Sequence, residues 1–150
     1  MTNVATLERP THTQENMTQE ELIRAFWNSL INKRDSEWQK LASPDITFVG
    51  SLSSRMWKGF DGIIEYSPLM FARFDDFGVK VNDIFTEGNR SCVTLTFGGR
   101  NTAGLFGNQP CGKQVNYDAV AIITTNNGLI EKVRVTGNII QILEQVGQQI

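Results

Sequence analysis

The chain is poor in the residues on which metal sites, disulfide frameworks and histidine-based catalysis depend. Among 150 residues it has one histidine, His12, and two cysteines, Cys92 and Cys111. Because His12 lies in a polar N-terminal segment, a histidine-based zinc site or a Ser-His-Asp triad in the folded core is nearly excluded. Two cysteines are too few for a disulfide framework, so we expect free thiols, as in cytosolic proteins.

The chain also has little net charge and no long apolar run. The 14 Lys and Arg residues nearly balance 16 Asp and Glu residues, and the net charge is −2. Without a basic run, neither nucleic acid nor an anionic membrane is expected as a main partner. No apolar stretch approaches the length of a membrane span, and the N-terminus lacks the pattern of a secretory signal. We therefore expect a cytoplasmic protein.

The length predicts one domain with a sizeable core. Residues 1–16 are polar and without period, which predicts a disordered arm, and residues 17–150 form the predicted domain. Thr18 and Glu21 have the spacing of a capping box, and an apolar stripe follows to Ile31, which predicts an amphipathic helix. Further helices are expected at Ser36–Leu41, from near Asp61, and from Asn138 to about Val146.

Strand patterns dominate the second half of the chain. They cover Val79–Phe85, Cys92–Gly99, Val115–Thr125 and Leu129–Thr136, after an earlier strand at Asp45–Gly50. Helices early and a strand meander later favour an α+β fold, a curved mixed or antiparallel sheet folded over helices. The mouth of such a half-cone is the default place for a small-molecule site.

Alternation along two strands predicts which residues face the cone. Val93, Leu95, Phe97 and Asn101 share one side of their strand, and we expect that side to point inward. The next strand is partly apolar on both sides, so one side is expected to meet a helix or another subunit.

Several segments together resemble the SnoaL-like polyketide cyclase family of the nuclear-transport-factor-2-like superfamily. They are DITFVG, WKGFDGIIEY, the hairpin tip FGGRNTAGLFGNQPCG and the closing ILEQVG. The tip is similar to the signature G-x-H-T-G-x-x-x-G-x-x-P-x-G. The resemblance implies a cone-shaped barrel, usually dimeric. It also implies an enzyme that closes rings in polyketides or isomerises other apolar metabolites without a metal or redox cofactor.

The resemblance also implies catalytic positions, and most of them have lost their ionisable group. The family's acid falls on Asn138, its loop histidine on Asn101, the tryptophan of its last strand on Arg134, and a first-strand histidine on Val49. Asparagine cannot serve as a general base. We therefore predict that Asn101 and Asn138 act as neutral hydrogen-bond donors at an oxyanion, with Arg134 supplying positive charge.

Asp118 is the candidate for the missing base, because a carboxylate among apolar strand residues can have a raised pKa. The predicted substrate-binding residues are Tyr117, Trp57, Tyr66, Val49, Leu95, Phe97 and Thr136. Purely structural roles are the alternative for each of these residues. Asn138 fits a helix cap, Asn101 fits a loop brace, and Arg134 and Asp118 fit solvent-facing or paired positions. The aromatic residues fit core packing.

These patterns favour a cofactor-free cyclase or isomerase of an apolar, oxygenated metabolite, a polyketide or terpenoid, in secondary-metabolite biosynthesis. The alternative is a non-catalytic small-molecule binding protein on the same fold, which the lost acid and histidine favour. A third possibility is an interaction module that uses the outer sheet face. The expected partners are an apolar small-molecule substrate and a second copy of the chain in a homodimer.

Overall fold

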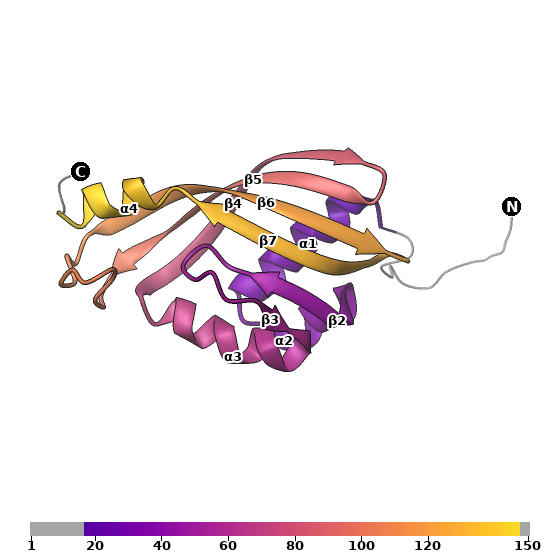
Figure 1. Cartoon of the computed structure of the whole chain (residues 1–150), viewed down its shortest axis with the longest axis horizontal. Helices are drawn as coiled ribbons and strands as arrows, with labels where there is room; N and C mark the ends of the chain where they lie inside the picture. The colour runs from indigo at the N-terminus through magenta and orange to yellow at the C-terminus, as the bar shows by residue number, and fades with distance from the viewer. Residues whose placement is uncertain (1–16, 148–150) are drawn as a thin grey trace, which may run out of the picture.

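The computed structural model describes residues 17–147 (Figure 1). The predicted arm, residues 1–16, lies outside the described residues. The helices are α1 (Gln19–Ile31), α2 (Asp35–Leu41), α3 (Gly59–Phe71) and α4 (Ile139–Gln145). The strands are β2 (Ala42–Val49), β3 (Trp57–Lys58), β4 (Phe74–Glu87), β5 (Arg90–Asn101), β6 (Gln114–Asn126) and β7 (Leu129–Gly137).

The strands form one six-stranded sheet in the order β3-β2-β7-β6-β5-β4. The β2–β7 pair is parallel and every other pair is antiparallel. The predicted α+β class with a curved mixed sheet is confirmed. The sheet is open, with β3 and β4 as its edges, and so it does not close into a barrel.

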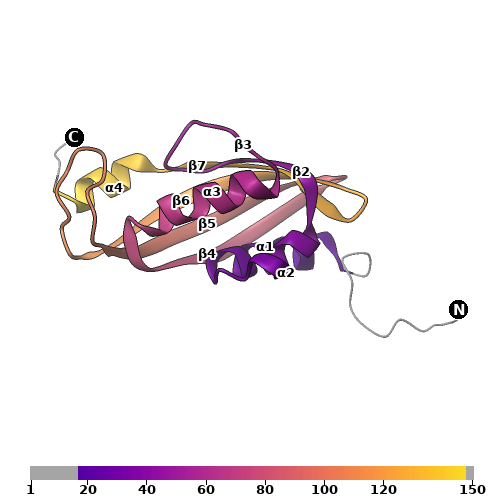
Figure 2. The same cartoon turned by 90° about the horizontal axis from the view of Figure 1, so that it is seen from below.

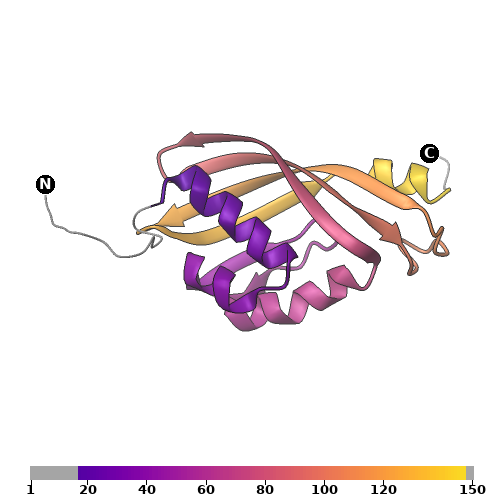
Figure 3. The same cartoon turned by 180° about the vertical axis from the view of Figure 1, so that it is seen from behind.

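Helices α1, α2 and α3 cover one face of the sheet, which we call the inner face (Figures 2 and 3). Helix α4 lies at the far end of the molecule, beside the tip of the β5–β6 hairpin (Figure 1). The opposite, outer face of the sheet carries none of these three helices. None of the described helices is long and apolar enough to cross a membrane.

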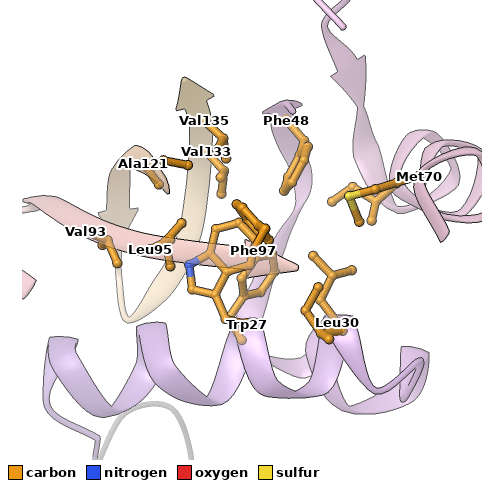
Figure 4. Packing of buried hydrophobic residues seen from close by; sticks show 14 of the residues in the cluster. Trp27, Leu30, Phe48, Met70, Val93, Leu95, Phe97, Ala121, Val133 and Val135 are labelled. Atoms are coloured by element: carbon orange, nitrogen blue, oxygen red, sulfur yellow. The ribbon is translucent and has the colours of Figure 1, made fainter. Parts of the chain in front are cut away.

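Helix α1 begins as its sequence predicts. The Glu21 amide donates to Thr18 Oγ1 over 3.1 Å, and the Thr18 amide donates to Glu21 Oε1 over 2.9 Å, which completes the capping box. The apolar stripe of α1 then packs on the inner face. Figure 4 shows Trp27 beneath Phe97 of β5, and their ring centroids lie 5.8 Å apart in an edge-to-face arrangement.

Helix α4 covers an edge that the sheet leaves open. Ala119 of β6 pairs with Gly137, the last residue of β7, so residues 114–118 of β6 have no β7 partner. Two α4 side chains take its place. Gln145 exchanges hydrogen bonds with the Asn116 backbone at 2.6 and 2.9 Å, and Gln141 accepts from the Asp118 amide at 2.7 Å. Gln141 and Gln145 are four residues apart on a helix, and Asn116 and Asp118 are two residues apart on a strand. Both spacings are about 6 Å, so each glutamine lies opposite one strand residue.

Several element boundaries differ from the sequence prediction. Strand β4 begins at Phe74, five residues early, and the two-residue strand β3 was not expected. Strand β2 begins at Ala42 and includes Pro44. Proline has no amide N–H to donate. Pro44 is tolerated in β2 because the pairing with β7 is interrupted between Ala42 and Thr47, where no hydrogen bond from this amide is required.

Candidate functional site

Aromatic side chains cover the inner face of the sheet between β2, α3, β5 and β6. The rings of Trp57 and Tyr66 lie 5.4 Å apart, and Tyr66 lies 5.6 Å from Phe48. Phe97 stacks on Tyr117 with a centroid separation of 5.4 Å. We call Ser51, Trp57, Tyr66 and Tyr117 the inner cluster, because they bring polar groups into this apolar surrounding.

The Tyr117 hydroxyl is the most deeply placed polar group of the inner cluster. Tyr117 is 1% exposed, and its hydroxyl lies 2.8 Å from Ser51 Oγ, with either atom able to donate. Burial raises the pKa of Tyr117 well above its ordinary value. The Ser51 hydrogen bond lowers this pKa, and the nearby Tyr66 raises it further, without changing the outcome. Tyr117 is therefore a neutral phenol at physiological pH.

Tyr66 supplies a second buried hydroxyl from α3. Its hydroxyl donates to Met70 Sδ over 3.8 Å, and a thioether is a weak acceptor. Burial raises the pKa of Tyr66 to about 12. The phenol therefore also stays protonated, and it is held only loosely by its present partner.

Trp57 adds an indole N–H to the inner cluster. Its Nε1 is buried and has no hydrogen-bond partner within residues 17–147, and the same is true of Trp27 Nε1 in the core. A buried donor without a partner carries a desolvation cost that an acceptor atom on a ligand would remove.

Two glycines allow the backbone to approach the side chains of the inner cluster closely. A Cβ added at Gly50 would overlap the Tyr66 hydroxyl, so only glycine fits there without moving that ring. A Cβ at Gly137 would come 3.0 Å from Ser51 Cβ and 3.1 Å from Tyr117 Cε2. The ends of β2 and β7 thus approach the tyrosines closely because they carry no side chain.

Asn101 lies on the inner side, as its strand predicts, but its amide is bound by backbone groups. It is 0% exposed. Its Nδ2 donates to the carbonyls of Arg73 and Ala103 at 3.2 and 2.9 Å, and its Oδ1 accepts from the Cys111 amide at 3.0 Å. Asn101 therefore holds the hairpin tip closed in this structure.

The structure divides the predicted site residues between two faces. Tyr117, Trp57, Tyr66, Leu95, Phe97 and Asn101 lie on the inner side, whereas Arg134, Asp118, Asn138, Thr136 and Val49 do not. Strand alternation is the reason, because Asp118 directly follows inward-facing Tyr117, and Arg134 lies between buried Val133 and Val135. Val49 pairs with Arg134 and shares its outer face.

Two of the outer-face residues, Asp118 and Asn138, have their own partners. Asp118 accepts hydrogen bonds from Thr96 Oγ1 and Gln141 Nε2, each at 3.1 Å, and Asn138 caps α4 through the Gln141 amide. A cavity of about 390 Å³ lies over this region. Its lining includes Asp118, Thr136 and Asn138, together with Asn82, Thr94 and Val120.

Sequence reasoning missed Ser51, the partner of Tyr117. It lies in the segment between β2 and β3 that shows no periodic pattern, so no local signal marks it. Within residues 17–147, no group of three or more His, Cys, Asp or Glu side chains is placed to hold a metal ion.

Comparison with known proteins identifies the family. Residues 21–146 match the family model of the SnoaL-like polyketide cyclases. The chain belongs to this family. A comparison with curated proteins gave no significant match.

Solved structures of low sequence identity share the fold of this SnoaL-like protein. A protein of Jannaschia described as a SnoaL-like polyketide cyclase is 17% identical, with a TM-score of 0.75 over 97% of this chain and 100% of that one. IdmH of Streptomyces antibioticus, described as a polyketide cyclase, is 16% identical, with a TM-score of 0.75 over 87% and 99%. AclR of Streptomyces galilaeus, described as a hydroxylase, is 18% identical, with a TM-score of 0.72 over 87% and 85%.

Family membership supports a general cyclase or isomerase role on a small-molecule substrate. At these identities the structural likeness shows the fold alone. The substrate and the acting residues must therefore be argued from this chain.

Proposed function

We propose that this protein is a cofactor-free cyclase or isomerase that acts on an apolar, oxygenated metabolite, a polyketide or terpenoid, in secondary-metabolite biosynthesis. Family membership supports the reaction class. The observation that carries the proposal is the buried Tyr117–Ser51 hydrogen bond, set among aromatic rings and beside the weakly held Tyr66 hydroxyl. Apolar surroundings with a few fixed donors suit a ligand that is mostly hydrocarbon with carbonyl oxygens.

In this proposal the tyrosines act on a substrate carbonyl. When Ser51 donates to Tyr117, the phenolic proton of Tyr117 is free to point at a ligand oxygen. As the carbonyl becomes an enolate, negative charge grows on that oxygen, and a hydrogen bond in a water-poor site stabilises it more strongly. Because both tyrosine pKa values are raised, the donors stay neutral throughout the physiological range.

The inner cluster offers donors but no obvious base. The buried polar residues of residues 17–147 are Ser29, Ser67, Ser91, Asn101 and Thr125, and none is a carboxylate or an imidazole. A proton removed from the substrate would then leave to water or to a basic group of the substrate itself. The same observation favours the second candidate function, a non-catalytic protein that binds such a metabolite on the same fold.

A second candidate site keeps the predicted carboxylate. Asp118, Asn138 and Thr136 line the outer cavity together, so a ligand bound there could meet a base and two polar groups. This arrangement places catalysis on the opposite side of the sheet from Tyr117. The two sites can therefore be separated by mutation.

We further propose that the protein is cytoplasmic and forms a homodimer through the outer face. Phe85 is 63% exposed and Val120 is 40% exposed, and both lie on the outer face, which none of α1, α2 and α3 covers. Exposed large apolar residues on one sheet face are typical of an interface.

The deciding experiment starts with thermal-shift and native mass spectrometric screening of oxygenated polyketides and terpenoids. A stabilising compound that emerges rearranged establishes the enzyme. Tyr117→Phe should then lower kcat by about 100-fold with little change in KM, because the lost donor acts mainly on the developing oxyanion. Asp118→Asn is the matched variant on the neighbouring residue and should retain activity.

Two other results would change the location of the site or the function. If Asp118→Asn abolishes turnover and Tyr117→Phe does not, the outer cavity is the site. A ligand that binds and returns unchanged supports the binding protein.

A further inference from the structure

A row of cations and hydroxyls crosses the outer face. Lys58 of β3 pairs with Thr47, Thr47 with Lys132, Lys132 with Thr124, and Thr124 with Arg90 of β5. Paired residues in a sheet point to the same face, so these five side chains form a line across five strands. Two strand spacings separate successive cations, which places them about 10 Å apart along the backbone.

This row lies along a groove that contains no negative charge. The cavity has a volume of about 770 Å³, and its lining includes Lys58, Arg90, Lys132 and Arg134 but no Asp or Glu. All four cations are exposed, and none forms an ion pair with a carboxylate of residues 17–147. Glu87 pairs with Arg90 in the sheet at the β4 end of the row and does not line the cavity.

The concentration of positive charge is not a consequence of composition, because the whole chain has a net charge of −2. Like charges gathered on one face repel one another, and a bound anion would relieve this repulsion. Threonine hydroxyls between the cations add hydrogen-bond donors, while Val49, Ile122 and Met56 give the groove an apolar part. Donors of this kind recognise phosphate and carboxylate oxygens.

We propose that the cationic row and its groove bind a small polyanion, a molecule with two or more phosphate or carboxylate groups. The volume falls within the range of small-molecule sites. The groove crosses the outer face from β3 to β5, next to the apolar residues Phe85 and Val120, and it lies on the opposite side of the sheet from the inner cluster. The site is independent of the proposed reaction, and it shares the outer face with the proposed homodimer interface.

The test is isothermal titration of the full chain with sodium tripolyphosphate and, separately, with citrate, at two or more ionic strengths that are set by sodium chloride and matched between the two ligands. We expect saturable binding of one ligand per chain that weakens as salt increases. Lys132→Gln should weaken binding about tenfold, equivalent to about 1.4 kcal/mol. Lys58→Gln, at the row's end, should weaken it less.

Lys80→Gln is the matched control, because Lys80 is an exposed outer-face lysine on β4, opposite Thr96 and outside the groove. It should leave binding unchanged. Tighter binding of tripolyphosphate assigns a phosphate ligand, and tighter binding of citrate assigns a carboxylate ligand. Circular dichroism of each variant checks that it is folded.

Three outcomes would overturn the proposal. One is the lack of saturable binding of either probe. Another is an equal loss of affinity in Lys80→Gln, which would mean a diffuse charge effect. The last is that Lys132→Gln changes the sedimentation of the protein and leaves the binding of both probes unchanged, which would make a second copy of the chain the occupant of the groove.

Discussion

At the scale of single residues, the hairpin tip depends on one buried amide. Asn101 connects three backbone groups, at Ala103 and Cys111 of the hairpin tip and at Arg73 before β4. The sequence showed that this residue lies at the strand end and left two roles open, ligand contact and loop brace. The hydrogen bonds of the structure favour the brace, because each polar atom of the amide already has a backbone partner.

Asn101→Ala should lower the free energy of unfolding by about 3 kcal/mol, since three hydrogen bonds in a buried place are lost. Urea denaturation measures this loss. Asn82→Ala removes a single exposed bond to Thr96 and should cost under about 0.5 kcal/mol. If instead Asn101→Ala leaves stability intact and weakens ligand binding, the amide serves the ligand.

The two tyrosines make a specific pH prediction. They are the only tyrosines in the chain, and both pKa values are raised in the fold, that of Tyr66 to about 12. The folded protein therefore keeps protons that the unfolded chain releases above its ordinary pKa of about 10. Stability should be intact below about pH 10 and fall between about pH 10 and 12, by up to about 1.4 kcal/mol per pH unit for each tyrosine.

Denaturant titrations at about pH 8 and about pH 11 would measure this loss, and the near-ultraviolet absorbance of tyrosinate would report the ionisation directly. In Tyr66→Phe the alkaline loss should be about half as steep. Ionisation of both tyrosines near pH 10 in the folded protein would show that the hydroxyls reach water.

At the scale of elements, local signals predicted the parts that local chemistry decides. The capping box at Thr18 is a short-range feature and formed as predicted. The Asn127-Gly128 turn between β6 and β7, with φ of 53° and 77°, is equally local, because Asn-Gly favours this conformation. Strand β3 could not be predicted, because two residues become a strand only through pairing with Thr47 and Phe48. The start of β4 was also missed, since Asp76 has a positive φ of 53° that interrupts alternation.

Helix α4 protects the open edge of β6 through two glutamine side chains. Replacing both, in Gln141→Ala with Gln145→Ala, should lower the free energy of unfolding by about 2 kcal/mol, because the backbone groups of Asn116 and Asp118 lose their partners. Glu144→Ala, on an exposed position of the same helix, should change it by less than about 0.5 kcal/mol. Chemical denaturation of the three proteins would decide, and equal stability of all three would contradict the edge-protection role.

At the scale of the whole molecule, the sheet separates two chemistries. Its inner face carries aromatic rings and neutral donors, and its outer face carries the carboxylate, the cations and the exposed apolar residues. The sequence predicted the fold class and the inner side of β5. It could not determine which side of β7 faces inward, because that depends on the pairing of β7 with β2 and β6. Arg134 was therefore left open between the two faces, and the single-domain assignment of residues 17–150 stays a prediction.

The proposed homodimer gives the prediction at this scale. Phe85→Asp should shift the protein from dimer to monomer in sedimentation velocity, because a charge would be buried in the interface. Ile64→Asp is the control, since Ile64 is 42% exposed on α3, away from the outer face. A wild-type protein that sediments as a monomer at high concentration would refute the dimer.

The parallel register of β7 beside β2 has a consequence for how this chain can evolve. Val133 stands beside Phe48, and Arg134 beside Val49. A one-residue insertion in the turn before β7 that shifts the register of the whole strand by one residue would turn every side chain of the strand over. Arg134 would then point to the inner face, and Val133 and Val135 would be exposed to solvent. Small changes in turn length could thus exchange the chemistry of the two surfaces in a single step, whereas point substitutions would need many.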